Sequence, residues 1–349
     1  RPDNPAVAVA PPPPPPLAFS EIDASGMAHL KVGDRNWTTL PTPPQDDPEE
    51  RLVYPPTTSA TLNLAATAAQ CARIWRSIDK AFAARCLAAA ERAWAAAKRN
   101  PEVYVSGAFT GSGGYGDRVV DDEFFWAAAE LFVTTGRAEF GDFVRASPHW
   151  TAELQEPSWP RTAALGMIAI ATAGASPSDA AHAWAALRIA ADRFLAERDR
   201  TGYHIPYAAA VFPWGSTSSL LNRAIVLALV HGHSGDPKYR DAVIDSVDYL
   251  LGRNPIDQSY ISGYGARPMR NPHHRFWAHS MDPKLPGPPP GVLSGGPNSG
   301  FMSDQVGAAM KGKCAPMACY ADDIRAFSLN EVAVNWNAPL FWVAAWLDE

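Results

Sequence analysis

Hydrophobic residues recur at helical spacing along most of the chain from Ser59 onward. Apolar side chains three, four and seven residues apart line one face of a helix, and the strict alternation typical of strands is almost absent. Two stripes show this spacing most clearly: Trp184, Leu187, Ala191, Phe194 and Leu195, and then Val243, Val247, Leu250 and Leu251. Further helical runs are residues 61–77, 80–98, 163–173, 219–231 and 330–347, and another helix opens at Asp121–Glu123. The pattern predicts about eight helices in an all-α fold of stacked helical hairpins.

The first 58 residues differ from the rest because proline interrupts them repeatedly. Six consecutive prolines, Pro11–Pro16, favour polyproline II, since each ring fixes φ and removes a backbone donor. Within this region only Met27–Val32 has the composition of a short strand. We therefore expect residues 1–58 to be an extended loop region that belongs to the same domain as the helices, and residues 59–349 to form the helical body.

One long segment inside the helical body, Leu251–Pro297, carries no helix signal. It is rich in polar and aromatic side chains, and long irregular segments in compact domains are usually functional. The side chains concerned are Asn254, Tyr260, Tyr264, Arg267, His273, His274, Arg275 and Trp277.

Composition narrows the class of protein. The 349 residues include 30 Lys+Arg and 36 Asp+Glu, and the net charge of −6 argues against a nucleic-acid partner because phosphate binding needs a basic face. The apolar stretches are too short to span a bilayer, so no membrane partner is expected either. The chain begins at Arg1 without a signal-peptide pattern, and we expect it to be a mature or cleaved product. Its 12 tryptophans suit either stacking on sugars or core packing.

The four cysteines, Cys71, Cys86, Cys314 and Cys319, lack the paired spacing of a zinc ribbon. Cys314 and Cys319 are close enough in sequence to bridge a loop, which would fit an oxidising compartment. A reduced, buried pair is the alternative, and the sequence leaves both states open.

Two short polar runs offer catalytic chemistry. In residues 330–339, Glu331 stands among three amide side chains and a tryptophan, and a carboxyl group buried beside an aromatic ring keeps its proton at neutral pH, as a general acid must. The alternative is a glutamate in the first turn of a helix, capped by the preceding asparagine. In residues 271–275, His273 and Arg275 can donate hydrogen bonds to sugar hydroxyls or a carboxylate, and the alternative is a solvated turn.

Together these two runs resemble the active-site signatures of glycoside hydrolase family 9, the inverting cellulases. Residues 259–275, Ser-Tyr-Ile-Ser-Gly-Tyr-Gly-Ala-Arg-Pro-Met-Arg-Asn-Pro-His-His-Arg, resemble the histidine signature. Residues 320–338 resemble the second signature, with an aromatic, Asp, aromatic, Glu and Asn-Ala at the expected offsets. Around them, residues 214–216, 250–255, 294–298 and 122–136 also look like that family. The resemblance covers roughly residues 52–349 and is closest to bacterial members with an N-terminal immunoglobulin-like module.

The resemblance implies an (α/α)6 barrel of twelve helices with an open cleft across one end. It implies Glu331 as the general acid of a catalytic group that includes Asp322 and His273, with Arg275 binding substrate. The sugar platforms that it implies are Trp214, Trp277 and Tyr264. Phe327 stands where tyrosine is more common, which removes one hydroxyl.

The same resemblance implies a calcium ion. Family members hold calcium in the region of the Asp121–Glu123 helix start, and Asp122 and Glu123 would be its ligands here. Carboxylates and backbone carbonyls at such spacing suit a hard cation. Helix capping and solvation are the alternative. No organic cofactor is implied.

The sequence departs from the family in one serious respect. An inverting hydrolase needs a second carboxylate, roughly 6.5–9.5 Å from the acid, to activate water on the opposite face of the sugar. The family carries this base in an Asp-Ala-Gly-Asp stretch, and no Asp-x-Gly-Asp occurs in this chain. The helices are also too few for the barrel. We therefore expect the chain to be the C-terminal part of a longer polypeptide, with an N-terminal fragment of the same precursor as a partner.

The expected function is hydrolysis of β-1,4-glucosidic bonds in cellulose or related β-glucans, with inversion, by a secreted or periplasmic endoglucanase. One alternative is an exo-acting β-glucosidase or glucosaminidase of the same family, acting on cello-oligosaccharides. The other is a catalytically silent glycan-binding fragment that lacks the base.

Overall fold

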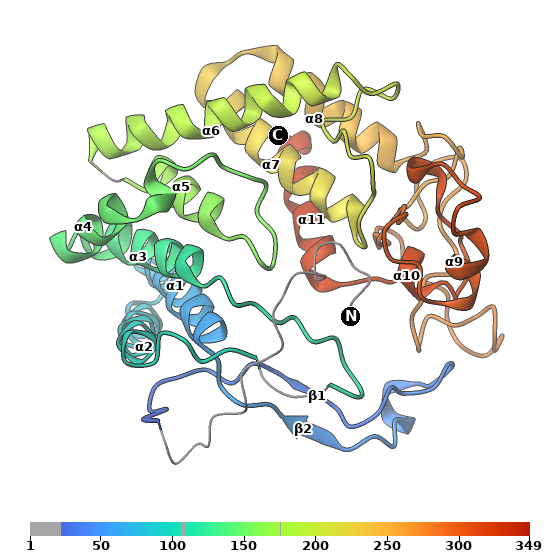
Figure 1. The fold of residues 1–349 in the computed structure, drawn as a ribbon, viewed down its shortest axis with the longest axis horizontal. Helices are drawn as coiled ribbons and strands as arrows, with labels where there is room; N and C mark the ends of the chain where they lie inside the picture. The colour runs from blue at the N-terminus through green and yellow to red at the C-terminus, as the bar shows by residue number, and fades with distance from the viewer. Residues whose placement is uncertain (1–21, 106–108, 175) are drawn as a thin grey trace. The chain divides into compact units, whose positions relative to one another are not determined.

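A computed structural model describes residues 22–105, 109–174 and 176–349. These ranges contain eleven α-helices and one pair of short strands, so the all-α prediction is confirmed (Figure 1). No helix in the described ranges has the length and apolarity needed to cross a membrane. The polyproline expectation for Pro11–Pro16 lies outside the described residues. The chain divides into two compact units, and the division falls within the helix Pro177–Arg198.

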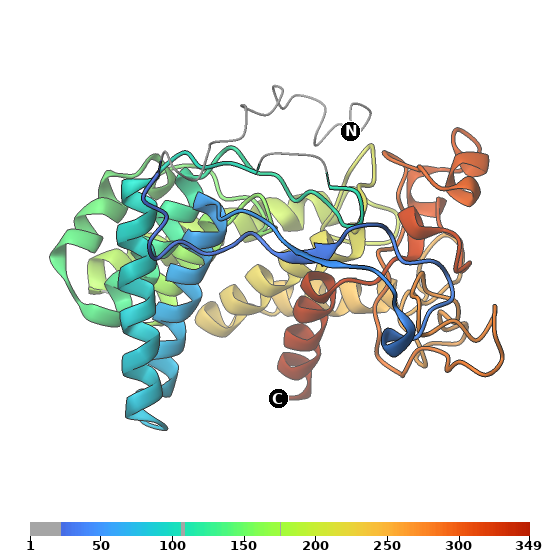
Figure 2. The ribbon, with the colours of Figure 1, turned by 90° about the horizontal axis from the view of Figure 1, so that it is seen from below.

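The N-terminal unit, which contains residues 22–37 and 49–190, is built on a helical hairpin. Its elements are β1 (Val32–Asp34), β2 (Arg51–Val53), α1 (Thr58–Trp75), α2 (Lys80–Arg99), α3 (Asp121–Thr135), α4 (Ala138–Ala146), η3 (Pro148–Trp150), α5 (Ala163–Thr172) and most of α6 (Pro177–Arg198). α1 and α2 lie side by side, as Figure 2 shows, and α1 also packs against α3. α3 in turn packs against α4 and α5.

Local chemistry sets the ends of these helices. The Thr57 hydroxyl accepts the backbone N–H of Ala60 at 3.2 Å at the start of α1. The Asp79 carboxylate accepts the N–H of Phe82 at 2.9 Å at the start of α2. Such caps satisfy donors that a helix leaves unpaired in its first turn. α3 ends at Gly136, whose φ of 71° is a left-handed conformation that glycine adopts without strain.

Small residues form much of the core of the N-terminal unit. Ala65, Ala66 and Ala69 of α1 and Ala90 and Ala93 of α2 are fully buried. The C-terminal half of α2 has a larger anchor, because the Trp94 ring packs edge-on against three rings of α3 and α4: Phe124, Phe140 and Phe143. The two halves of α2 are therefore held in different ways.

The C-terminal unit contains residues 38–48 and 191–349. Its elements are η2 (Pro44–Asp46), the end of α6, α7 (Ser216–Ser234), α8 (Pro237–Leu250), α9 (Gln305–Met310), η4 (Pro316–Ala318), α10 (Phe327–Asn330) and α11 (Val334–Asp348). α7 packs against α8 and α11. The predicted apolar stripes are confirmed at Leu187, Ala191 and Phe194 of α6 and at Val243 and Leu250 of α8, all of which are fully buried.

Several sequence predictions of local structure are wrong. The strand predicted at Met27–Val32 lies at Val32–Asp34, because its position is set by antiparallel pairing with Arg51–Val53, a partner that composition does not reveal. The helices α4, α9 and α10 were not predicted, and the last two have only 6 and 4 residues, too few to show a stripe. The helix predicted from Asn330 starts at Val334.

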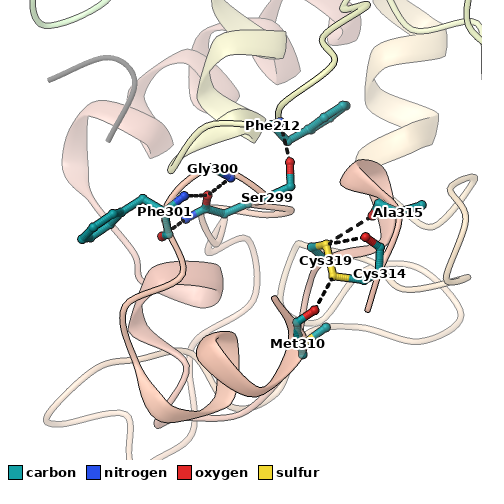
Figure 3. Close-up of a disulfide and its surroundings, with 9 residues drawn as sticks. Phe212, Ser299, Gly300, Phe301, Met310, Cys314, Ala315 and Cys319 are labelled. Atoms are coloured by element: carbon teal, nitrogen blue, oxygen red, sulfur yellow. Dashed lines mark hydrogen bonds between the residues drawn. A yellow bond between two sulfur atoms is a disulfide. The ribbon is translucent and has the colours of Figure 1, made fainter. Parts of the chain in front are cut away.

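The segment between α8 and α9 has no helix or strand, as predicted for Leu251–Pro297. After α9, Cys314 and Cys319 are joined by a disulfide, which decides between the two states that the sequence left open (Figure 3). The Cys319 carbonyl accepts the backbone N–H of Asn298 at 3.0 Å. The disulfide therefore fixes the chain just before residues 320–338, where the second signature lies.

Candidate active site

Glu331 lies in extended backbone between α10 and α11, with φ −56° and ψ 152°. Its carbonyl accepts the N–H of Gly295 at 2.8 Å, and the carbonyl of Asn330 accepts the N–H of His273 at 3.2 Å. His273 and Glu331 also form an isolated parallel bridge. Two loops therefore hold the backbone of Glu331, whose half-buried side chain lies outside any helix. The alternative of a glutamate in a helical first turn is wrong.

His273 is held as a neutral imidazole with a defined tautomer. Its Nδ1 lies 2.7 Å from the Ile324 carbonyl, which can only accept, so Nδ1 carries the hydrogen. Burial lowers the pKa of His273, and the charge of Arg275 lowers it further, while the bond to Ile324 acts in the opposite direction. In the neutral form Nε2 has a lone pair and can accept a hydrogen bond.

Asp322 fixes the loop that carries His273. One carboxylate oxygen accepts the N–H of Arg270 at 2.8 Å and the other accepts the N–H of Asn271 at 2.7 Å. Burial raises the pKa of Asp322, and the two amide donors offset part of that rise. Because both oxygens bind backbone, the carboxylate acts on the position of the loop and through it on His273.

Arg275 connects the same loop to residues 38–48. Its Nε donates to the Thr38 carbonyl at 2.9 Å, and its own carbonyl accepts the N–H of Thr42 at 3.1 Å. This proline-flanked segment of the N-terminal region therefore packs directly beside the histidine loop.

Aromatic rings adjoin the histidine. Trp214 stacks on Phe301 with centroids 5.9 Å apart and planes at 17°, and Phe327 lies 5.9 Å from Trp214 at 33°. We call these three residues the Trp214 cluster. The Phe327 ring approaches His273 edge-on, with centroids 5.5 Å apart. The structure thus brings Trp214, one of the predicted sugar platforms, next to the histidine loop.

The other two predicted platforms lie elsewhere on the loops. Trp277 stacks on His274 with ring centroids 4.0 Å apart, and Tyr264 is 56% exposed in the turn between Gly263 and Gly265. His274 Nδ1 accepts the N–H groups of Phe276 and Trp277, so this nitrogen carries no hydrogen and the His274 imidazole is neutral. Burial, with Arg275 and His273 contributing, lowers the pKa of His274 to about 4.

Trp336, expected from the sequence only as an aromatic neighbour of Glu331, is wedged between two glycines. A Cβ on Gly215 would lie 2.7 Å from the indole, and a Cβ on Gly295 would lie 2.9 Å from it. Contacts this short exclude any side chain at either glycine. Since Gly295 also donates to the Glu331 carbonyl, the wedge sets the position of the candidate acid. The available signal was the pairing of Trp-Gly and Gly-Gly turns with a tryptophan shortly after Glu331.

The N-terminal unit holds the second candidate site, an acidic cluster of Asp117, Asp122 and Glu123. The side chains are 9%, 4% and 1% exposed. Asp122 Oδ2 accepts the N–H of Thr162 at 2.6 Å, and Asp117 Oδ1 accepts the N–H of Val119 at 2.9 Å. Among the described residues, one oxygen of each carboxylate (Asp117 Oδ2, Asp122 Oδ1 and Glu123 Oε2) is buried without a hydrogen-bond partner.

Burial makes the ionised form of these carboxylates unfavourable unless positive charge or protons neutralise them. Burial raises the pKa of Glu123 to about 10, and the charge and hydrogen bond of Asp122 add to the rise. Burial also raises the pKa of Asp117. No three His, Cys, Asp or Glu side chains in the described ranges are already arranged to hold a metal ion. The orphaned oxygens nevertheless fit a hard cation that completes its shell with backbone carbonyls or water.

Comparison with known proteins places the chain. Residues 18–344 match the profile of Glycosyl hydrolase family 9. Among curated proteins, the chain is 43% identical to a cellulose 1,4-beta-cellobiosidase of Acetivibrio thermocellus, over 93% of this chain and 39% of that protein. It is 41% identical to endoglucanase C of Cellulomonas fimi, over 95% of this chain and 31% of that protein. The chain thus spans less than half the length of these relatives.

Solved structures of family 9 enzymes have the same fold as this chain. A metagenome-derived glycoside hydrolase family 9 endoglucanase matches with a TM-score of 0.82 at 35% identity, over 94% of this chain and 59% of the other. The family 9 endoglucanase J30 matches with a TM-score of 0.86 at 28% identity, over 94% and 61%. The fold is that of the family's (α/α)6 barrel over about this share of its length, as the resemblance implied. Profile, relatives and fold agree, and the chain belongs to glycosyl hydrolase family 9.

Proposed function

We propose that this chain is the acid-bearing part of an inverting endo-β-1,4-glucanase. The observation that carries the proposal is the setting of Glu331, whose backbone two loops hold beside a neutral histidine and the Trp214 cluster. Cellulose-degrading names among the relatives support β-glucan as the substrate class.

In this proposal Glu331 protonates the oxygen of the leaving sugar. A half-buried carboxyl group with a fixed backbone can deliver its proton to one point in the cleft. Neutral His273 accepts a hydrogen bond from a sugar hydroxyl at Nε2, because Nδ1 is committed to Ile324. Asp322 is a positioning residue, and Arg275 carries positive charge beside the same loop.

Trp214 is the sugar platform that the geometry supports best. It is half-buried and stacked on Phe301, so its orientation is fixed before substrate arrives. Trp277 and Tyr264 are retained as platforms for more distant sugars.

The catalytic base comes from a polypeptide segment that this sequence does not contain. The proposal rests on the lack of any Asp-x-Gly-Asp and on coverage of only 59–61% of the family 9 structures compared above. One face of α11 supports it as well. Val334 and Phe341, seven residues apart on one helical face, are 88% and 78% exposed. We assign this face to the N-terminal fragment of the same precursor, because apolar faces of this kind are rarely left in water.

The acidic cluster holds calcium in this proposal. Asp122 and Glu123 are the ligands, and each has one buried carboxylate oxygen without a hydrogen-bond partner among the described residues. The ion would neutralise carboxylates that burial otherwise destabilises, and its role would be structural.

The protein acts outside the cytoplasm, in a secreted or periplasmic location. The Cys314–Cys319 disulfide supports this assignment because such bonds persist in oxidising compartments.

Exo action is the second candidate, favoured by one observation: the relative at 43% identity is named a cellobiosidase, while the one at 41% is named an endoglucanase. Viscosity of a soluble glucan compared with release of short products separates the two modes. Rapid loss of viscosity supports endo action, and early release of cellobiose without it supports exo action.

The test of the proposed function is the variant Glu331→Gln, assayed together with the upstream segment. The amide keeps the shape of the side chain but cannot donate the proton, so kcat should fall on the order of 10²–10⁴-fold while glucan binding is retained. Glu102→Gln, at an exposed glutamate, serves as the control and should act like wild type. Near-normal turnover in Glu331→Gln would remove Glu331 from the mechanism. Glycan binding without any turnover in the wild type would favour the silent glycan-binding alternative.

A further inference from the structure

Two cysteines that the candidate sites do not use face one another across the α1–α2 hairpin. Cys71 of α1 and Cys86 of α2 are free and half-buried. Their sulfur atoms lie 3.3 Å apart, and the Cys86 thiol donates to Cys71. A disulfide has an S–S distance of about 2.05 Å, so a side-chain rotation or a slight approach of the helices would bring the atoms to bonding distance.

We propose that Cys71 and Cys86 form a second, reversible disulfide that staples the tip of the α1–α2 hairpin. The sequence spacing gives no hint of this pair, because the two residues lie on separate helices joined by the turn at residues 76–79. The inference concerns the N-terminal unit alone and does not depend on the proposed hydrolase activity.

The packing of the hairpin shows why a crosslink is useful there. Trp94 anchors the C-terminal half of α2 on the rings of α3 and α4. The other half, next to the cysteines, has an open surface pocket of about 190 Å³ lined by Ala72, Arg76, Lys80, Ala83, Ala84 and Leu87. Short alanine side chains bury little apolar area, so this half of the helix pair is held weakly by burial.

Exposed apolar residues mark the same tip. Ile74 is 56% exposed, Trp75 is 38% exposed and Ile78 is 68% exposed. Trp75 packs edge-on against Phe82 of α2, with ring centroids 5.2 Å apart, whereas Ile74 and Ile78 contribute little to holding the hairpin closed while they remain in water. A covalent bond one turn below them would limit the separation of α1 from α2 without requiring any further burial.

The oxidation needs only thiol–disulfide exchange with a low-molecular-weight disulfide such as oxidised glutathione. One cysteine thiolate attacks a glutathione sulfur, which releases one glutathione thiolate and leaves a mixed disulfide on the protein. The second cysteine, as thiolate, attacks the protein sulfur of that mixed disulfide and releases the second glutathione. The two cysteines lose two electrons, which reduce glutathione disulfide, and their two protons end on the released thiolates.

The thiols should react slowly at neutral pH. The hydrogen bond from Cys86, together with burial, raises the pKa of Cys71, and only the thiolate form is nucleophilic. We therefore expect the crosslink to form faster as the pH rises above neutrality.

The experiment treats the full chain, with any co-purifying segment, with oxidised glutathione and then alkylates the remaining thiols. Non-reducing peptide mapping should find residues 71 and 86 in one crosslinked peptide pair. The Cys314–Cys319 bond is the internal control, since it is already formed. The matched variant Cys86→Ser should lack the crosslink and leave Cys71 alkylated.

The staple should also raise thermal stability. Closing a loop of about 15 residues should raise the unfolding midpoint of a chain of this length by about 4 °C. For each protein we take the unfolding midpoint of the oxidised form minus that of the reduced form. The value for Cys86→Ser is then subtracted from the value for wild type. This subtraction cancels the effect of the Cys314–Cys319 bond, which both proteins contain. Free, alkylated Cys71 and Cys86 after oxidation, or glutathione retained on one of them, would overturn the pairing. A crosslink that leaves the corrected midpoint unchanged would overturn its role as a staple.

Discussion

The two candidate sites of this chain differ in how the oxygens of their buried aspartates are paired, although the Asn330 side-chain oxygen beside Glu331 also lacks a partner among the described residues. Around Glu331, both oxygens of Asp322 accept backbone amides, and His273 donates to a carbonyl. In the acidic cluster, three buried carboxylate oxygens have no partner among the described residues. Buried polar groups in native proteins are nearly always paired, so these unpaired oxygens are consistent with the calcium ion proposed above.

The two sites therefore depend on different components from outside the chain. Hydrogen bonds within the chain fix the loops around Glu331, so the proposed acid has a defined position before substrate arrives. In the acidic cluster, burial raises the pKa of Glu123 to about 10, and the neighbouring Asp122 adds to the rise. Protons or a cation must neutralise it. In the proposed function, the first site needs a second carboxylate from another segment and the second site needs a cation.

The largest expected effect comes from disturbing the preorganised site through Gly295. A Cβ there would lie 2.9 Å from the Trp336 indole, so Gly295→Ala should displace the wedge and the backbone of Glu331 with it. Misplacement by about 1 Å can cost on the order of 10²-fold in rate. We expect that loss in kcat, measured on soluble glucan with the upstream segment present.

Gly232→Ala is the matched control, because a Cβ at Gly232 of α7 meets nothing within 4 Å. It should keep wild-type kcat and an unchanged or higher unfolding midpoint. Wild-type kcat in Gly295→Ala would mean that the Trp336 wedge does not position the acid.

A smaller effect, on stability, comes from supplying or removing calcium at the acidic cluster. Calcium at about 100 times its Kd should stabilise the folded chain by about 2.7 kcal/mol, and chelator should remove that gain. Asp122→Asn should abolish the response, while Asp241→Asn, at an exposed acid of α8, should retain it. An unchanged unfolding midpoint in excess chelator, with no calcium by elemental analysis, would return these carboxylates to helix capping.

The smallest expected effect is a pH dependence that arises beside the preorganised site. The pKa of His274 is lowered from 6.5 to about 4, so the unfolded chain takes up a proton first as the pH falls. The corresponding stability is present above pH 6.5 and is lost progressively down to about pH 4. His274→Asn keeps an acceptor for the two N–H groups and does not titrate, so its unfolding midpoint should fall less steeply across this window.

The control for that experiment is His204→Asn, at an exposed histidine with φ of 52°, a conformation that asparagine tolerates. It should follow the wild-type pH dependence. Equal slopes for His274→Asn and wild type would show that His274 is not held neutral by the fold.

Sequence predicted the parts of this structure that depend on periodicity and missed those that depend on long-range contacts. The stripe of Leu187, Ala191 and Phe194 predicted α6, because apolar residues on a buried helical face recur about every 3.6 residues. The apolar run into α11 suggested a helix from Asn330. The Asn330 side chain instead donates to the Asn271 carbonyl at 2.6 Å, and the Gly295 N–H donates to the Glu331 carbonyl. These bonds hold Glu331 in extended backbone, and the helix begins only after it.

The candidate residues divide in the same way. Glu331, Asp322 and His273 were found because they lie in recognisable runs, but those runs could not show that Asp322 binds backbone on both oxygens. The Trp336 wedge and the Cys71–Cys86 pair depend on which helices meet. No local pattern records such contacts.

The central claim is that this chain carries the acid but not the base of an inverting hydrolase. The most direct measurement is the turnover of rigorously purified 349-residue chain on soluble β-glucan, with and without the upstream segment. We expect no turnover by the chain alone and restored turnover when the segment is added, since no stretch of this sequence matches the Asp-containing motif that should activate water. Robust hydrolysis by the chain alone would contradict it and would direct the search for a base to Asp117, Asp121 and Asp322.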